Sequence, residues 1–217
     1  MSQASLFDKT PPTTPDETPL PPQESTLSSW EEFQARVLKC TKCPLHQGRT
    51  HVVPGEGNPR AEILFIGEGP GQDEDRQGRP FVGRAGQLLN KLLAEIGLKR
   101  EEVYIANVVK CRPPNNRDPH DEEILACWPY LEAQIRLINP LMIITLGRHS
   151  LGRFLPNVSI SAAHGQPKKR QSDGKVIYPV FHPAAALYRA SMLGALQEDF
   201  RKIPTVLKMI KGKRQQG

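Results

Sequence analysis

The four cysteines of the chain are the residues whose type and spacing suggest the most specific chemistry. Cys40 and Cys43 form a C-x-x-C pair, whereas Cys111 and Cys127 stand singly and much later in the sequence. Four thiolates can bind one zinc ion or a [4Fe–4S] cluster. Zinc ribbons usually present two tight knuckles, and here the second half of the set is split, which suits a cluster at least as well. Disulfides and free thiols are the remaining alternatives.

The first residues of the chain indicate a compartment in which thiols stay reduced. Residues 1–29 contain no apolar stretch of the kind found in signal peptides. Because disulfides need an oxidising environment, we expect a cytoplasmic protein whose metal centre joins distant segments of the chain.

Length and composition predict one folded domain with two tails. The 217 residues, of which 38% are hydrophobic, can build one sizeable core. No apolar run approaches the roughly 18 residues of a membrane span, so we expect no membrane association. We also expect a monomer. The boundaries are a Pro-rich disordered arm over 1–29, a domain over 30–207 and a basic tail over 208–217.

A short apolar island interrupts the arm. Residues Gln3 to Phe7 read Gln-Ala-Ser-Leu-Phe, which resembles the peptide with which bacterial replication and repair proteins bind the sliding clamp. An ordinary chain terminus is the alternative interpretation.

Four short apolar runs are typical of buried strands and must position whatever chemistry the chain performs. They span residues 61–66, 103–109, 141–146 and 176–181, and helical patterns over 86–96 and 121–138 lie between them. This alternation predicts an α/β fold with a mostly parallel four-stranded sheet and helices on both faces. Ligands of such sheets bind at the carboxyl ends of the strands.

Polar and glycine-rich segments follow three of these runs. The first run leads into a turn over 67–75 that begins Gly-Glu-Gly-Pro-Gly, the second contains Asn107, and the last is followed by His182. The turn lacks the third glycine of a dinucleotide-binding fingerprint and the G-K-[ST] of a P-loop. A nucleotide phosphate is therefore not the expected ligand.

Five ordered motifs resemble the family 4 uracil-DNA glycosylases of bacteria and archaea. They are the cysteine pair at 40–43, the turn at 67–71, Gly-Arg-Pro-Phe-Val-Gly at 78–83, Asn-Val-Val-Lys-Cys-Arg-Pro-Pro at 107–114, and His-Pro-Ala-Ala-Ala-Leu at 182–187. The resemblance implies a three-layer α/β/α fold and a [4Fe–4S] cluster on the four cysteines. It further implies cleavage of the N-glycosidic bond of deoxyuridine in DNA, releasing uracil and leaving an abasic site for base excision repair. The expected location is the bacterial cytoplasm, in association with the nucleoid.

Three side chains offer what that reaction needs. Because the departing uracil carries negative charge on O2, a neutral His182 that donates a hydrogen bond would stabilise it. Asn107 offers an acceptor and a donor that match the N3–H and O4 edge of uracil, and Phe81 would stack on the flipped base. The structural alternatives are a His at a strand end, a turn-forming Asn and a core Phe.

The glycine-rich turn is expected to line the pocket and to supply the water-positioning acid. The backbone of Glu68, Gly69 and Pro70 would lie beneath the pyrimidine. Gly69 occupies the position at which the best-known branch of the superfamily carries a water-activating Asp, so this role would pass to Glu74, or to Asp73 or Asp75. A solvated acidic loop is the alternative.

The net charge of +6 favours a polyanionic partner, although many basic proteins have none. We expect Lys110, Arg112 and Arg117 to bind phosphates of single- or double-stranded DNA. Extrusion of the base would leave a gap in the stack, which Leu187 or Arg189 would fill.

Other functional classes remain open at this level. A non-catalytic iron–sulfur DNA-binding protein would need the basic loops but no facing Asn and His. An electron carrier would use the cluster directly and would need no basic surface, while a superfamily relative would act on other deaminated bases.

Overall fold

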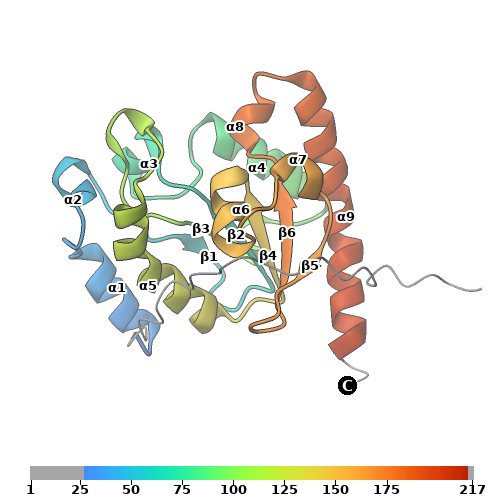
Figure 1. Ribbon diagram of the computed structural model, residues 1–217, viewed down its shortest axis with the longest axis horizontal. Helices are drawn as coiled ribbons and strands as arrows, with labels where there is room; N and C mark the ends of the chain where they lie inside the picture. Colours follow the sequence, from blue (N-terminus) through green and yellow to red (C-terminus); the bar gives the residue numbers. More distant parts are fainter. Residues whose placement is uncertain (1–26, 215–217) are drawn as a thin grey trace, which may run out of the picture.

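A six-stranded sheet forms the centre of the molecule in the computed structural model, which describes residues 27–214 (Figure 1). The strand order is β1-β3-β2-β4-β6-β5. The strands are β1 (Glu56–Gly57), β2 (Ile63–Gly67), β3 (Tyr104–Asn107), β4 (Met142–Leu146), β5 (Lys168–Lys169) and β6 (Val176–Val180). The chain turns from β2 to neighbours on both of its sides, β3 and β4. Such a point in the strand order opens a crevice at the carboxyl ends of the strands.

The predicted number of strands is wrong by two. The four predicted apolar runs form β2, β3, β4 and β6, and these strands pair in parallel. At the two edges, β1 and β5 add antiparallel pairs of two residues each. Their sequences, Glu-Gly and Lys-Lys, carry no hydrophobic pattern by which they could be recognised.

Helices cover both faces of this sheet and make three layers, as expected. They are α1 (Trp30–Leu38), α2 (Leu45–Gly48), α3 (Gln72–Gln77), α4 (Arg84–Glu95), α5 (Asp121–Ile138), α6 (Arg148–Phe154), α7 (Ile160–Ala163), α8 (Pro183–Ala186) and α9 (Ala190–Arg214), with 3-10 turns η1 (Arg100–Glu102) and η2 (Pro114–Asn116).

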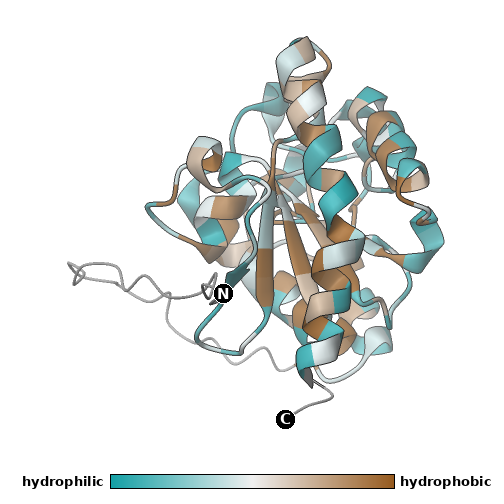
Figure 2. Ribbon diagram, turned by 90° about the vertical axis from the view of Figure 1, so that its right-hand side faces the viewer, coloured by the Kyte–Doolittle hydropathy of each residue, from teal (hydrophilic) through white to brown (hydrophobic). Residues whose placement is uncertain are grey.

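Alternate residues of each strand serve the two layers. Leu64 and Ile66 of β2 pack with residues of α1 and α5, while Ile63 and Phe65 pack with residues of α4 and α9. Figure 2 shows the apolar central strands in brown, behind helices along which teal and brown residues alternate. No helix within residues 27–214 is long and apolar enough to cross a membrane.

Both expected domain boundaries differ from the structure. Leu27 is buried and its carbonyl accepts a hydrogen bond from Arg136, so the fold includes residues that were assigned to the arm. Helix α9 continues to Arg214 and thus includes most of the predicted basic tail. The sliding-clamp peptide, Gln3 to Phe7, lies outside the described residues.

Candidate active site and cysteine centre

The carboxyl ends of three strands converge on one pocket with a volume of about 370 Å³. The pocket is lined by all six predicted substrate-binding residues and by Glu74: Glu68, Gly69, Pro70, Glu74, Phe81, Asn107 and His182. Residues more than a hundred positions apart in the sequence thus meet at the edge of the sheet where parallel α/β folds bind ligands.

The end of β2 is shaped so that Asn107 and Phe81 can approach each other. Gly67 pairs with Asn107 in register, and a Cβ atom added to Gly67 would lie 2.4 Å from Asn107 Oδ1 and 2.7 Å from Phe81 Cζ. Any side chain at this position would displace one of the two groups. Gly67 is therefore required for the geometry of the pocket.

The turn after β2 is fixed by an extension of the parallel pairing. The amide of Val108 donates to Gly67 O at 2.9 Å, and the amide of Val109 donates to Glu68 O at 3.0 Å. A Cβ atom on Gly69 would lie 2.9 Å from Val109 Cγ2. The backbone of 68–69 is therefore held tightly at the floor of the pocket.

The side chain of Asn107 is buried, with an exposed fraction of 1%. Its Oδ1 atom has no hydrogen-bond partner among the described residues. Since an unpaired buried polar atom costs roughly 1–3 kcal/mol, this amide is arranged for a donor that a ligand supplies.

His182 is held as a neutral donor by the short helix that it begins. Its Nδ1 atom accepts a hydrogen bond from the amide of Ala184 at 3.1 Å, so the proton of the neutral ring lies on Nε2. Burial, together with the nearby His149, lowers the pKa of His182 to about 4. The ring lies 5.7 Å from that of Phe81, centroid to centroid, so a donor and an aromatic face line one wall.

The carboxylate of Glu74 binds backbone amides, which differs from the free carboxylate that a water-positioning acid was expected to present. Oε1 accepts hydrogen bonds from the amides of Val82 and Gly83, both at 2.8 Å, and Oε2 accepts one from Gly71 at 3.1 Å. The two alternative acids of this turn are also engaged. Asp73 pairs with Arg76, and Asp75 accepts from the amide of Thr50.

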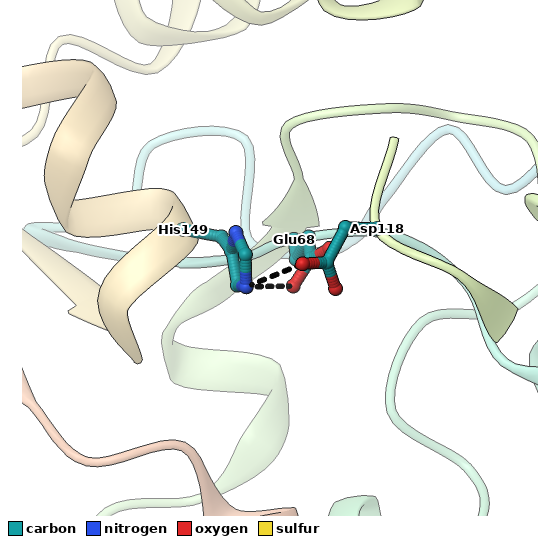
Figure 3. A group of neighbouring side chains, drawn as sticks. All are labelled: Glu68, Asp118 and His149. Atoms are coloured by element: carbon teal, nitrogen blue, oxygen red, sulfur yellow. Dashed lines mark ion pairs between the residues drawn. The ribbon is translucent and has the colours of Figure 1, made fainter. Parts of the chain in front are cut away.

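A cluster of three titratable side chains at the pocket was not predicted. Figure 3 shows His149 of α6 facing Glu68 and Asp118; its Nε2 lies 3.7 Å from Glu68 Oε2 and 3.2 Å from Asp118 Oδ2. Burial and the Asp118 carboxylate raise the pKa of Glu68 to about 7. The charge of this rim therefore changes with pH around neutrality.

Asn116 is a further pocket residue that the sequence did not predict. It lines the pocket in a left-handed conformation (φ 54°), and its Oδ1 accepts a hydrogen bond from Arg112 Nε at 2.8 Å. The Asn-Asn pair after Pro114 was a signal for a turn with positive φ, though not for a place in the pocket.

The residues predicted to contact DNA differ in how far their side chains are exposed to solvent. Arg189 is exposed and Leu187 is half-buried. Arg112 is half-buried beside the pocket, and Arg117 forms a two-bond ion pair with Glu123 at 2.7 and 2.8 Å. The expectation for Lys110 is wrong, because its side chain is 1% exposed and cannot reach DNA.

Lys110 instead connects the pocket to the cysteines. Its Nζ donates to the carbonyl oxygen of Asn107 at 2.7 Å and to Gln134 Oε1 at 2.5 Å, and its amide donates to Cys127 Sγ at 3.3 Å. Gln134 in turn donates to Pro54 O at 2.8 Å. This buried network fixes the end of β3, from which Asn107 projects.

The four cysteines line one small cavity, beside α1, α2 and α5. None of these four described thiols is joined in a disulfide. Arg49 Nη1 donates to Cys40 O at 2.8 Å and to Cys111 Sγ at 3.2 Å. Four thiols with N–H donors aimed at two of their sulfurs make a donor set for a thiolate-bound metal centre.

Comparisons with known proteins agree with this geometry. Residues 54–208 match the family model described as "Uracil DNA glycosylase superfamily". The chain is 51% identical over 182 residues to the Type-4 uracil-DNA glycosylase of Thermotoga maritima, covering 82% of this chain and 94% of that one. It is 50% identical over 185 residues to the Type-4 uracil-DNA glycosylase of Sulfurisphaera tokodaii, covering 82% and 84%, and 45% identical over 185 residues to that of Archaeoglobus fulgidus, covering 82% and 92%.

Proposed function

The chain belongs to the uracil-DNA glycosylase superfamily, and we propose that it hydrolyses the N-glycosidic bond of deoxyuridine in DNA. The products are free uracil and an abasic site, which begins base excision repair. The observation that carries this proposal is the convergence of Asn107, His182 and Phe81 on one pocket, because each supplies a different interaction that uracil needs.

His182 stabilises the leaving group. As the glycosidic bond lengthens, negative charge gathers on uracil O2, and the Nε2–H of a neutral His182 donates a hydrogen bond to it. Preorganised donors of this kind are worth about 10²–10³ in rate. The Ala184 amide holds the ring, so little reorganisation is needed when charge develops.

Asn107 selects the base. Its unpaired Oδ1 accepts from uracil N3–H, and its Nδ2 donates to O4. Cytosine presents the opposite pattern and would leave buried polar atoms unpaired on both sides. Phe81 stacks on the extruded pyrimidine, while the backbone of Glu68, Gly69 and Pro70 lies beneath it.

A [4Fe–4S] cluster on Cys40, Cys43, Cys111 and Cys127 is the proposed cofactor. In a tetrahedral zinc site with Zn–S bonds of about 2.3 Å, all sulfurs would lie within about 4 Å of one another. No three of the four thiol sulfurs lie within 4.8 Å of each other, and this wider spacing favours a cube of iron and sulfide. The cluster would join distant segments rather than take part in hydrolysis, and iron and sulfide analysis would test its presence.

DNA binding is proposed for the surface around the pocket. Arg112, Arg117 and Arg189 bind phosphates, and Leu187 fills the gap left by the extruded base. Tyr188 joins them, because its side chain is 77% exposed and the Arg84 guanidinium lies over its ring, with Cζ 5.8 Å from the ring centroid. The clamp-binding role of Gln3 to Phe7 and a cytoplasmic location at the nucleoid remain parts of the same proposal.

The test is excision from end-labelled oligonucleotides that carry one uracil opposite G, opposite A or unpaired, with alkali to reveal abasic sites. We expect cleavage with uracil and none with cytosine or thymine. Asn107→Asp removes the donor to O4 and lowers excision by about 10²-fold, while Asn58→Asp serves as the control outside the pocket. Cleavage of a hypoxanthine substrate in preference to uracil would replace the proposal with that of a different deaminated base.

A further inference from the structure

The backbone of Phe81 is held in a conformation that a phenylalanine rarely adopts. Its φ angle is +51°, in the left-handed region that disfavours residues with a Cβ atom. The side chain is 6% exposed and lines the pocket. Strained backbone at a binding site persists only when its surroundings hold it in place.

A carboxylate holds the amides that follow Phe81. Glu74, on the neighbouring helix α3, accepts hydrogen bonds from the next two amides, Val82 and Gly83, at 2.8 Å each. Its other oxygen accepts from Gly71 and so ties this segment to the floor of the pocket.

The guanidinium of Arg100 holds the backbone carbonyls of Pro80 and Phe81. Arg100 begins η1, and its side chain is 16% exposed. Nη1 donates to Phe81 O at 3.2 Å, and Nη2 donates to Pro80 O. Nη1 also donates to Asn90 Oδ1 at 3.1 Å, and Nε lies 3.6 Å from Glu56, so the guanidinium itself is fixed.

Close packing completes this arrangement. A Cβ atom on Gly86 would lie 1.8 Å from Phe81 O. Helix α4 can therefore approach the backbone of Phe81 only because residue 86 is a glycine. The backbone carbonyls of residues 80–81 face the Arg100 cation and the amides of residues 82–83 face the Glu74 anion. Each kind of backbone group thus binds a side chain of the charge that suits it.

We propose that Glu74 and Arg100 act together as positioning residues that keep the left-handed backbone of Phe81, and with it the ring that stacks on uracil. This inference rests on the proposed function through the stacking role of Phe81. Arg100 is not among the residues that line the pocket, so its effect on the substrate passes through Phe81.

A double-mutant cycle tests the inference with Arg100→Gln, Phe81→Ala and the double variant, each measured as kcat/KM on the uracil oligonucleotide. Base stacking is typically worth roughly 1–3 kcal/mol, or about 5- to 150-fold. We expect about a tenfold loss in each single variant and no further loss when Arg100→Gln is added to Phe81→Ala. Arg100→Lys, which keeps one cationic donor, should recover part of the loss.

Arg79→Gln is the matched control. The Arg79 guanidinium binds the same Glu56, at 2.7 and 2.9 Å, but among the described residues it donates no hydrogen bond to residues 80–83. The kcat/KM of Arg79→Gln should therefore equal that of the parent. Losses in Arg100→Gln and Phe81→Ala that multiply in the double variant would overturn the inference. So would an Arg100→Gln protein with unchanged kcat/KM.

Amide hydrogen exchange gives a second readout that needs no catalysis. The amides of Val82 and Gly83 should exchange slowly in the parent and at least tenfold faster in Arg100→Gln and Glu74→Gln, while amides of the central strands keep their rates. Unchanged exchange at these two amides would contradict the inference even if the protein excised no uracil. Faster exchange without any uracil excision would contradict the proposed function alone.

Discussion

The proposed uracil pocket and the cysteine centre share the segment 107–111, yet their buried polar groups are paired to different extents. At the pocket, Asn107 Oδ1 is buried without a hydrogen-bond partner in the described part of the chain. At the cysteine centre, Lys110 pairs through both its amide and its Nζ, and Arg49 bridges Cys40 and Cys111. The pocket therefore presents an unpaired buried acceptor to a ligand, whereas Lys110 and Arg49 are paired within the scaffold beside it.

The largest expected effect comes from breaking the scaffold. Cys127→Ser should lower the iron content of the purified protein and lower the thermal midpoint by about 10 °C or more, since a structural metal centre contributes folding free energy. Leu125→Ser, on the exposed side of the same helix, is the control. Full iron content and an unchanged midpoint in Cys127→Ser would show that this residue is no ligand.

Removal of the His182 side chain should lower the rate of uracil excision and leave the fold intact. His182→Ala should reduce single-turnover excision by about 10²–10³-fold and change the thermal midpoint by only a few degrees. His120→Gln, an exposed histidine at the start of α5, should retain full activity. A loss of less than tenfold in His182→Ala would remove this residue from the reaction.

The lowered pKa of His182 should have a smaller effect, on how the folding stability changes with pH. Its folded-state pKa is about 4, whereas a free histidine has about 6.5. The unfolded chain therefore binds more protons between these values, so the contribution to stability is present above pH 6.5 and is lost as the pH falls toward 4. At pH 5 the loss is about 2 kcal/mol.

Urea unfolding of the parent and of His182→Ala at pH 7 and pH 5 measures this contribution. The variant should lose less stability than the parent between the two values. An equal loss in both proteins, or a His182 imidazole signal that titrates near pH 6.5 by NMR, would contradict the lowered pKa of this ring.

The smallest effect concerns the surface around the pocket. Arg189→Gln should weaken DNA binding at low salt and reduce the slope of log affinity against log salt concentration by about 1. Lys211→Gln is the control, because Lys211 Nζ binds Glu62 just before the amino end of β2, whereas the pocket lies at the carboxyl ends of the strands. Equal slopes in Arg189→Gln and the parent would place the DNA elsewhere.

The sequence was most informative where a pattern repeats along one element. Helix α5 has the predicted limits, Asp121–Ile138, because its apolar periodicity is long. The four parallel strands begin and end within about two residues of the predicted runs, since buried strands must be continuously apolar.

The errors arise where a residue's environment comes from distant segments. Lys110 looks like a surface cation in the sequence, but Gln134 and the Asn107 carbonyl surround it. Glu74 looks like a catalytic acid, but its partners are the amides of Val82 and Gly83. Backbone acceptors and donors leave no signature in a sequence, so neither role was predictable.

A crystal structure of the protein with free uracil bound shows whether uracil completes the pocket. We expect uracil N3 within hydrogen-bond distance of Asn107 Oδ1, O2 within hydrogen-bond distance of His182 Nε2, and the uracil ring stacked on Phe81. Uracil bound elsewhere, or bound in this pocket with Asn107 Oδ1 still unpaired, would contradict this expectation.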